Sequence, residues 1–286
     1  MRYRIIGIDL DGTLLDGSGR VSQRNREAIC AAHEAGAVVV PCTGRGWIES
    51  RHLLAPIPDL DIGVFVTGAQ VSEVSTGRLL DGARFDPNVA MDVIKQLQHL
   101  PEAVLTFRDR QHGEHDYLIT GEGELTDNTL WWFDFHNVAV IRQRIVEVSD
   151  LGEILRIGCV ADGQRLRAVV DRLRSTMGDQ IEAHSFAAIQ QSDTVDGLHV
   201  MEVFARGVDK WRGLSWIARR HQVGADQVAA IGDQVNDLSM LIRAGCGIAM
   251  ANAAEEVQSA ADYVTGSNDD DGVAWAIEKL ISSQWG

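Results

Sequence analysis

The sequence has few cysteines, and none of them has the spacing of a metal site or a disulfide framework. Cys30, Cys42, Cys159 and Cys246 lie far apart along the chain, without a Cys-x-x-Cys pair. Such a distribution indicates neither zinc ligation nor a network of disulfides. We expect reduced, structural thiols, as in a cytosolic protein.

Long apolar runs are absent as well. No stretch approaches the roughly 20 apolar residues that a membrane-spanning helix needs. Residues 1–4 lead directly into an apolar strand, without the apolar region and cleavage site of a signal peptide. The sequence therefore predicts a cytoplasmic protein without a membrane segment.

Basic residues are scarce relative to acidic ones. The chain has 26 lysines and arginines against 41 aspartates and glutamates, a formal charge of −15. A uniformly acidic surface repels nucleic-acid backbones and anionic lipid, so we expect neither as a partner. With 286 residues, 45% of them hydrophobic, the chain is long enough for two compact units.

The N-terminal part alternates strand and helix patterns. An apolar strand over about residues 3–9 precedes a helix that begins near Ser22 and ends at Gly36. The continuous apolar run 38–40 is typical of a strand buried on both faces of a parallel sheet, and the run 64–66 continues the pattern. This alternation predicts an α/β fold with a doubly wound, Rossmann-like, mostly parallel sheet.

The C-terminal part repeats this alternation. The strands expected there are 199–204, 228–231, 247–250 and 263–264, and the helices are 210–221, 238–243 and 273–281. Between the two parts, strand-like and helical segments alternate in a pattern that differs from that of the flanking parts. We therefore predict one core from residues 1–83 and 194–286, with residues 84–193 inserted as a small α+β unit.

Two carboxylates end the first predicted strand. Asp9 and Asp11 are two residues apart, so on a strand their side chains point to one face. Two close carboxylates repel each other and need a cation or a shared proton. The alternative is an ordinary polar turn at Asp11 and Gly12.

Polar residues also follow other predicted strands, where a parallel sheet presents ligand groups beyond its carboxyl edge. Thr43 and Gly44 offer a hydroxyl and backbone amides that suit a phosphoryl oxygen, although such a turn is also ordinary. Lys210 begins a helix, where a cation opposes the helix dipole, so its position suggests a nearby bound anion. The alternative is an ordinary solvent-facing lysine.

The last cluster is the segment 232–237. Asp233, Asn236 and Asp237 follow a buried strand and suit oxygen coordination of a divalent cation such as Mg²⁺. Asp233 could alternatively be a helix N-cap, which would explain one of the two acids.

Together these clusters resemble the motifs of the haloacid dehalogenase superfamily of phosphotransferases, in the family's order. The strings that carry the resemblance are Ile8-Asp9-Leu10-Asp11-Gly12-Thr13-Leu14-Leu15, Thr43-Gly44-Arg45, Lys210 and Gly232-Asp233-Gln234-Val235-Asn236-Asp237. Gly247-Ile248-Ala249-Met250-Ala251-Asn252-Ala253 resembles the Cof-type branch, subfamily IIB. About thirty residues separate Asp11 from Thr43, and about 165 separate Thr43 from Lys210. In this family that spacing implies an α+β cap domain of the second class, which serves as a substrate lid.

The resemblance implies a role for each matching residue. Asp9 would attack phosphorus to form an aspartyl phosphate, and Asp11 would act as general acid and base. Mg²⁺ would be held by Asp9, Asp11 (through its backbone carbonyl), Asp233 and Asp237. The substrate phosphate would be held by Thr43, Gly44, Lys210, Asn236 and Asn252.

The chain departs from the branch at two positions. Thr67 stands where the branch usually has asparagine in an Asn-Gly-Ala string. Cys42 also stands where alanine is common, and we interpret it as a small buried residue.

The leading interpretation is a Mg²⁺-dependent phosphatase of small phosphorylated metabolites, above all sugar phosphates. A phosphomutase resembling phosphomannomutase is the alternative, and it would need cap arginines for a second phosphate. The cap arginines are Arg108, Arg110, Arg142, Arg144, Arg156, Arg165, Arg167, Arg172 and Arg174. A non-catalytic binder of phosphometabolites would be expected to lack a catalytic residue, and none is missing. Candidate cap residues near the substrate are His112, His115, Trp131, Trp132 and His184, which could equally be core or surface. The sequence does not predict the oligomeric state.

Overall fold

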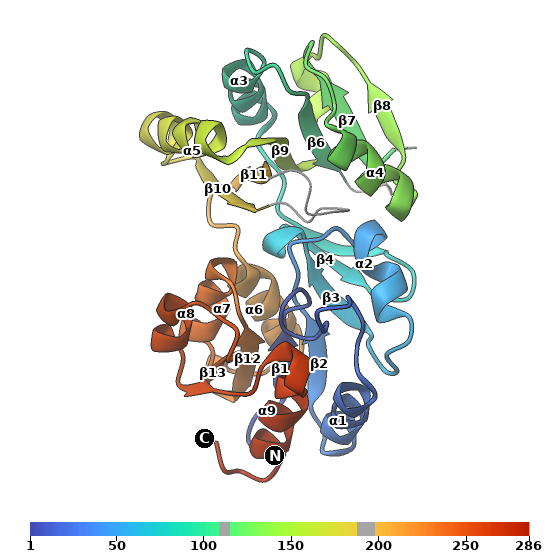
Figure 1. Cartoon of the computed structure of the whole chain (residues 1–286), viewed down its shortest axis with the longest axis vertical. Helices are drawn as coiled ribbons and strands as arrows, with labels where there is room; N and C mark the ends of the chain where they lie inside the picture. Colours follow the sequence, from blue (N-terminus) through green and yellow to red (C-terminus); the bar gives the residue numbers. More distant parts are fainter. Residues whose placement is uncertain (109–114, 188–197, 286) are drawn as a thin grey trace. The chain divides into compact units, whose positions relative to one another are not determined.

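The computed structural model describes residues 1–108, 115–187 and 198–285 (Figure 1). The chain forms two compact units, the first from Met1–Asp81 with Asp209–Gly286, and the second from Gly82–Val208. Each unit has its own cluster of buried apolar side chains.

The first unit is built on a five-stranded parallel sheet. Its strand order is β14-β13-β12-β1-β2, and β1 (Ile5–Ile8) lies between β12 (Val228–Gly232) and β2 (Val38–Pro41). All four residues of β1 are buried, as expected of a strand covered on both faces. The predicted doubly wound, mostly parallel sheet is confirmed.

Helices cover this sheet on both sides. Gly7 of β1 lies so close to Leu214 that a side chain there would collide with it, so α6 packs directly against the strand. Helices α1 and α9 pack against each other, away from α6 and α7 (Figure 1). The further strands of this unit are β13 (Cys246–Ala249) and β14 (Tyr263–Val264). Its helices are α1 (Gln23–Glu34), α2 (Trp47–Leu54), α6 (Lys210–Arg220), α7 (Leu238–Arg243), α8 (Glu255–Ala260) and α9 (Gly272–Ile281). None of the helices in the described part of the chain is long and apolar enough to cross a membrane.

The third apolar run, 64–66, does not simply extend the parallel sheet. A parallel bridge between Cys42 and Val64 joins it to the strand before it. It then forms an antiparallel sheet of β3 (Ile62–Phe65), β4 (Gln70–Glu73) and β5 (Leu79–Gly82). The chain reverses after β3 through a short turn, which the apolar pattern alone does not reveal.

The second unit is a six-stranded, mostly antiparallel sheet with the order β10-β11-β9-β6-β7-β8. Its strands are β6 (Val104–Arg108), β7 (Tyr117–Thr120), β8 (Val140–Arg142), β9 (Ile154–Asp162), β10 (Ile181–Ala187) and β11 (Leu198–Ala205). Its helices are α3 (Pro87–Leu97), α4 (Asp127–His136) and α5 (Gly163–Met177).

One strand belongs to a different unit from the one we predicted. The strand expected at 199–204 was assigned to the core, but β11 pairs with β9 and β10 in the second unit. That assignment is wrong, because an apolar strand has the same local pattern in either sheet. The predicted boundary between residues 193 and 194 lies outside the described residues.

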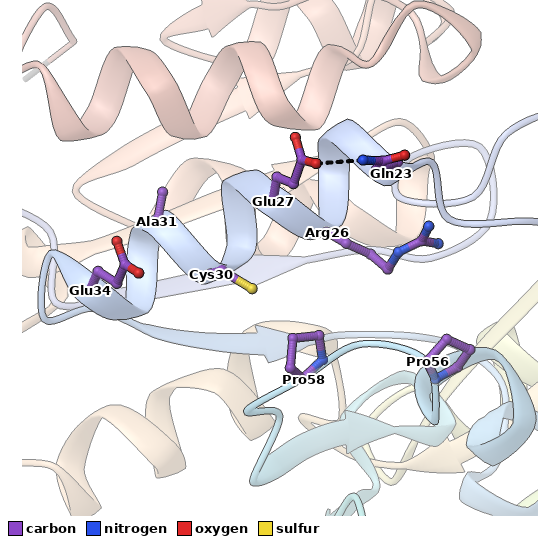
Figure 2. A pocket seen from close by; sticks show the side chains of 8 residues that line it. All are labelled: Gln23, Arg26, Glu27, Cys30, Ala31, Glu34, Pro56 and Pro58. Carbon is purple, nitrogen blue, oxygen red and sulfur yellow. Dashed lines mark hydrogen bonds between the residues drawn. The ribbon is translucent and has the colours of Figure 1, made fainter.

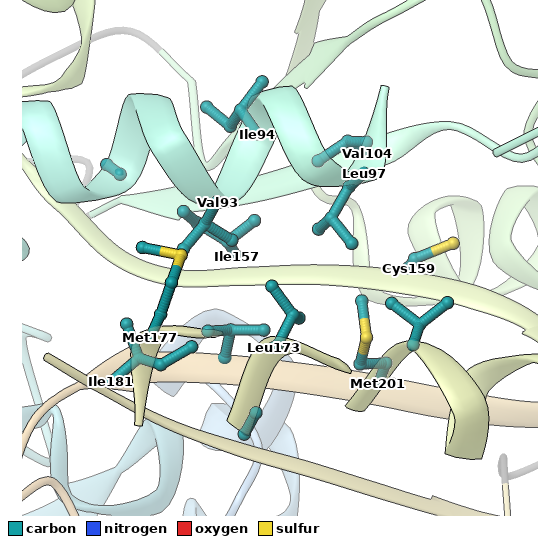
Figure 3. Packing of buried hydrophobic residues seen from close by; sticks show 14 of the residues in the cluster. Val93, Ile94, Leu97, Val104, Ile157, Cys159, Leu173, Met177, Ile181 and Met201 are labelled. Atoms are coloured by element: carbon teal, nitrogen blue, oxygen red, sulfur yellow. The ribbon is translucent and has the colours of Figure 1, made fainter. Parts of the chain in front are cut away.

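The core of the second unit lies between its sheet and two helices. Val93 and Leu97 of α3 and Leu173 and Met177 of α5 are buried in one cluster with Ile157 of β9 (Figure 3). Fully burying each large side chain contributes about 1.5–3 kcal/mol, so this cluster stabilises the packing of α3 and α5 against the sheet.

A shallow groove on the first unit lies between α1 and the loop that contains Pro56 and Pro58 (Figure 2). Its lining includes the half-buried Cys30, whose sulfur points toward the proline loop. None of the predicted site residues lines this groove. The predicted reactive groups lie elsewhere, at the ends of the parallel strands.

Candidate active site

The predicted site residues follow neighbouring strands of the parallel sheet. Asp9 follows β1, Thr43 follows β2 and Asp233 follows β12, and β1 pairs with both of the other strands. Because all three strands run in the same direction, these residues lie at one edge of the sheet.

Three carboxylates meet at this edge. One oxygen each of Asp9, Asp233 and Asp237 lies within 4.8 Å of the others, and all three residues are buried. Among the described residues this is the group of acidic side chains that could hold a metal ion. Carboxylate oxygens are the ligands that Mg²⁺ uses in proteins, so the donor set fits this ion.

A buried lysine lies against the three carboxylates. Lys210 Nζ donates to Asp9 Oδ1 at 2.6 Å and to Asp237 Oδ1 at 2.5 Å. These ion pairs explain why a cation stands at the start of α6, against the helix dipole. Burial lowers the pKa of Lys210. The charges of Asp237 and Asp9 and their hydrogen bonds outweigh this effect and raise the pKa well above its usual value. The lysine is therefore charged, and it is not a solvent-facing side chain.

Two of the carboxyl groups have raised pKa values. Burial, followed by the charge of Asp237, raises the pKa of Asp9 well above its ordinary value, although Lys210 opposes the shift. Burial also raises the pKa of Asp233. The cluster thus holds more negative charge than one ammonium group compensates.

Hydrogen bonds fix the loop that carries Asp233 and Asp237. Asp237 Oδ2 accepts from the backbone N–H groups of Asp233 and Gln234, at 3.0 and 2.9 Å. Asp233 accepts from the hydroxyl of Thr13 at 2.8 Å and from the side chain of Gln234 at 3.0 Å. It is therefore not the helix N-cap that the sequence left open. Thr13, which is fully buried, is a site residue that sequence reasoning missed beyond its place in a motif.

Gly12 keeps the first acidic loop close to this one. Its φ is +76°, and a side chain there would lie 2.4 Å from Asp233 Oδ2. Both the turn and the close approach therefore require glycine.

Asp11 stands apart from the three carboxylates. Its carboxylate forms a two-point ion pair with Arg45, with Nε to Oδ2 at 2.8 Å and Nη2 to Oδ1 at 2.5 Å. The Asp11 side chain is 41% exposed, whereas the Arg45 side chain is 14% exposed. Sequence reasoning included Arg45 in a motif but gave it no function, because its partner lies 34 positions away.

Thr43, Gly44 and Asn236 form another part of the site. Thr43 is buried, and its Oγ1 accepts from the backbone N–H of Arg45 at 3.1 Å. The Asn236 amide approaches Gly44, and its Oδ1 is buried without a hydrogen-bond partner among the described residues. A buried acceptor left unpaired in this way is unfavourable and suits a hydrogen-bond donor of a bound ligand.

Asn252 stabilises the first acidic loop. Its amide donates to the carbonyl of Gly12 at 2.8 Å, and its Oδ1 accepts from the N–H of Asn268 at 3.0 Å. It therefore holds the turn that follows Asp9.

The turn at Thr67 is strained. Val66 and Thr67 have φ values of +52° and +53°, in the left-handed region that branched side chains disfavour. The Thr67 N–H donates to the carbonyl of Thr43 at 3.1 Å, which ties the turn to the loop after β2. Asparagine adopts this conformation at lower cost than threonine, which gives a physical reason for an asparagine at this place.

We expect Thr67→Asn to stabilise the protein by about 1 kcal/mol, because strained residues of this kind cost roughly 1–3 kcal/mol each. Urea unfolding measures the change. Thr67→Val is the matched control, since it keeps the branched Cβ and should bring no gain. Lower stability in Thr67→Asn, with Thr67→Val unchanged, would contradict this explanation.

In the second unit, most of the described arginines have partners within the unit. Arg156 pairs with Glu202, Arg165 with Glu102 and Arg144 with Glu122. The arginines that donate to backbone carbonyls are Arg108, Arg142, Arg172 and Arg174. Arginines engaged in this way are less available for a second phosphate.

Other cap candidates have local contacts. Trp131 and Trp132 contact each other on α4, with ring centroids 6.0 Å apart, and His184 on β10 contacts Arg174. His115 lies just before β7, and we propose no function for it. Arg110 and His112 lie outside the described residues.

Comparison with curated proteins gives relatives that span the whole chain. The 5-amino-6-(5-phospho-D-ribitylamino)uracil phosphatase YwtE of Bacillus subtilis is 30% identical over 299 residues, which cover 99% of each chain. Phosphatase YwpJ of the same organism is 28% identical over 294 residues, covering 97% of this chain and 100% of its own.

Comparison with solved structures and with a family model indicates the same family as these relatives. A haloacid dehalogenase-like hydrolase from Bacteroides thetaiotaomicron has a TM-score of 0.75 and 26% identity, covering 97% of this chain and 99% of its own. The subclass IIB sugar phosphatase BT4131 shares the fold, with a TM-score of 0.75 and 21% identity, covering 97% of this chain and 99% of its own. The family model described as haloacid dehalogenase-like hydrolase matches residues 6–277. The chain belongs to the haloacid dehalogenase-like hydrolases, in their Cof-type branch, and is a phosphoric monoester hydrolase.

Proposed function

We propose that the chain is a Mg²⁺-dependent phosphatase that hydrolyses small phosphorylated metabolites, sugar phosphates above all, through an aspartyl phosphate on Asp9. The observation that carries the proposal is the buried cluster of Asp9, Asp233, Asp237 and Lys210. Its chemistry is that of a charged nucleophile beside a phosphate site.

The charge of the cluster supports a divalent cation. Three carboxylates face one ammonium group, which leaves two uncompensated negative charges in a buried place. Burying unpaired charge is costly, so a doubly charged cation is the natural complement. Asp9, Asp233 and Asp237 would hold it, and the Asp11 carbonyl is a further candidate ligand. When bound, Mg²⁺ neutralises charge on the phosphoryl group and orients it.

Asp9 is the nucleophile in this proposal. Its carboxylate attacks phosphorus, the bond from phosphorus to the leaving oxygen breaks, and the phosphoryl group moves to Asp9. Lys210 holds Asp9 in place and supplies positive charge at the transferring group. Thr43 and Asn236 offer a hydroxyl and an amide to the phosphoryl oxygens, and this fixed charge and positioning supplies most of the catalysis.

Asp11 transfers the protons. It gives a proton to the leaving oxygen as the first bond breaks, and then takes one from the water that hydrolyses the aspartyl phosphate. Its exposed carboxylate, separate from the three buried ones, leaves it accessible to both the leaving group and water.

Two alternatives are less well supported. A phosphomutase would need free cap arginines for a second phosphate, and most of the described ones already have partners. A non-catalytic binding protein would not need a complete set of nucleophile, acid and metal ligands.

Phosphate release from a substrate panel tests the proposal. We expect release from sugar phosphates with Mg²⁺, and loss of release when a chelator removes the metal. The panel includes 5-amino-6-(5-phospho-D-ribitylamino)uracil, which the name of the YwtE relative suggests. A mutase arm adds a sugar bisphosphate and follows isomerisation. Isomerisation without phosphate release, or release that the chelator leaves unchanged, would contradict the proposal.

A further inference from the structure

The two-point contact between Arg45 and Asp11 suggests a function for Arg45 that rests on the proposed phosphatase mechanism. Both oxygens of Asp11 are held by one guanidinium, at 2.8 and 2.5 Å. A planar two-point pair fixes the orientation of a carboxylate as well as its position. A single ammonium group could not do so.

The backbone of Arg45 is itself held on two sides. Its N–H donates to Thr43 Oγ1 at 3.1 Å, and its carbonyl accepts from the N–H of Val66 at 2.9 Å. Thr43 belongs to the expected phosphate-binding loop, and Val66 belongs to the strained turn. The backbone of Arg45 is therefore held in place next to the expected phosphate-binding loop.

A buried carboxylate supports the same segment. Glu49 is 2% exposed, and its Oε2 accepts from the N–H of Gly46 at 2.6 Å. This bond fixes the start of α2, directly after Arg45. The charge of Glu49 also favours the charged form of Arg45. The guanidinium is thus hydrogen-bonded to Asp11, and the charge of the buried Glu49 also acts on it.

The surroundings explain why Asp11 needs such a partner. Its side chain is far more exposed than those of the three clustered carboxylates, and the lysine of the cluster bonds to Asp9 and Asp237 instead. An exposed side chain without a partner samples several rotamers, and proton transfer requires a defined geometry.

We propose that Arg45 is the positioning residue for Asp11, holding it in the orientation in which it exchanges protons with the leaving oxygen and with water. The two contacts set the orientation of the Asp11 carboxylate, and proton transfer opens one of them. The other contact, made through a different N–H group, then keeps the side chain in place while the released oxygen carries or accepts the proton. Arg45 does not touch the transferring phosphoryl group in this mechanism. Its loss therefore weakens proton transfer and not phosphate binding.

Leaving groups of different basicity separate these two functions. A sugar phosphate leaves as an alkoxide and needs the proton, whereas 4-nitrophenyl phosphate leaves as a stabilised phenolate and needs it much less. General acid catalysis contributes about 10²–10⁴-fold, so we expect Arg45→Gln to lower kcat/KM for the sugar phosphate by about 10²-fold. For 4-nitrophenyl phosphate we expect a loss of about tenfold or less, with KM little changed for both.

Three further variants make the test decisive. Arg45→Lys keeps one cation without the two-point geometry and should give an intermediate loss with the same dependence on leaving group. In Asp11→Asn, adding Arg45→Gln should cause little further loss, because both changes remove one function. Arg24→Gln, which breaks a surface ion pair in which one guanidinium nitrogen contacts both oxygens of Glu278, is the control and should keep full activity.

Circular dichroism and thermal unfolding show whether each variant is folded, and Arg45→Lys carries the test if Arg45→Gln is not. An equal loss for both substrates, or a rise in KM for both, would overturn this inference and would assign Arg45 to phosphate binding. In that case the wild-type enzyme would still depend on Asp9 and Mg²⁺, so the proposed function would stand. Wild-type protein that releases no phosphate from either substrate would overturn both.

Discussion

Asp9→Asn is expected to lower kcat by at least about 10⁴-fold, because an amide cannot attack phosphorus as a carboxylate does. The structure places this carboxylate in a buried cluster, 2.6 Å from the ammonium group of Lys210. Phosphate release with Mg²⁺, measured at saturating substrate, gives the change in kcat.

The Asp9→Asn variant should remain folded. Burial and the charge of Asp237 disfavour the Asp9 carboxylate, so a neutral amide relieves repulsion while Lys210 keeps its contact with Asp237. Asp92→Asn, which changes an exposed carboxylate on α3, is the control and should keep full activity. Substantial phosphate release by a folded Asp9→Asn protein would show that another group is the nucleophile.

Lys210→Met is expected to lower both stability and activity. The lysine is fully buried between Asp9 and Asp237, and removing one partner of a buried ion pair costs about 3–5 kcal/mol. Loss of a fixed charge at the transferring group should lower kcat by about 10²–10³-fold. Urea unfolding in a chelator measures the first effect, and phosphate release with Mg²⁺ measures the second.

A surface pair serves as the control for Lys210. Lys95 lies 3.5 Å from Asp92 on α3, and both side chains are exposed. Exposed pairs contribute about 0–1 kcal/mol, so Lys95→Met should change stability little. If Lys210→Met were as stable as Lys95→Met, the buried ion pairs described here could not be the main compensation for the clustered carboxylates.

The sequence predicts the local elements of the first unit well. Ser22 begins α1, and its side chain accepts from the N–H of Asn25. Gly36 ends the helix region with a φ of +87°. These signals are local, since capping and a positive φ depend on residues adjacent in the chain.

Pairing between distant segments is what the sequence does not show. The strand at 199–204 has the same pattern in either sheet, so its partners β9 and β10 could not be predicted. The turn after β3 makes an antiparallel sheet from a run that matched a parallel strand. Local apolar periodicity reports burial and does not identify the neighbouring strand.

In the candidate site, too, local features could be predicted and contacts between distant segments could not. The motifs indicated the residue types and the sheet edge, but not their contacts. The pairing of Lys210 with Asp9 and Asp237 joins positions 201 and 27 residues apart in the chain. The contact between Arg45 and Asp11 likewise depends on how two loops meet in the folded unit. Such contacts follow from the tertiary structure alone.

The most direct test of the central claim is to locate the phosphoryl group on the enzyme during turnover. Wild-type protein with Mg²⁺ and its best substrate is quenched in acid within the first turnovers, digested with trypsin and mapped by mass spectrometry. Cleavage after Arg4 and Arg20 places Asp9 in the peptide 5–20. We expect one phosphoryl group on Asp9 in this peptide, and none in Asp9→Asn. A phosphoryl group on another residue, or an unlabelled peptide while Asp9→Asn continues to release phosphate, would contradict the mechanism.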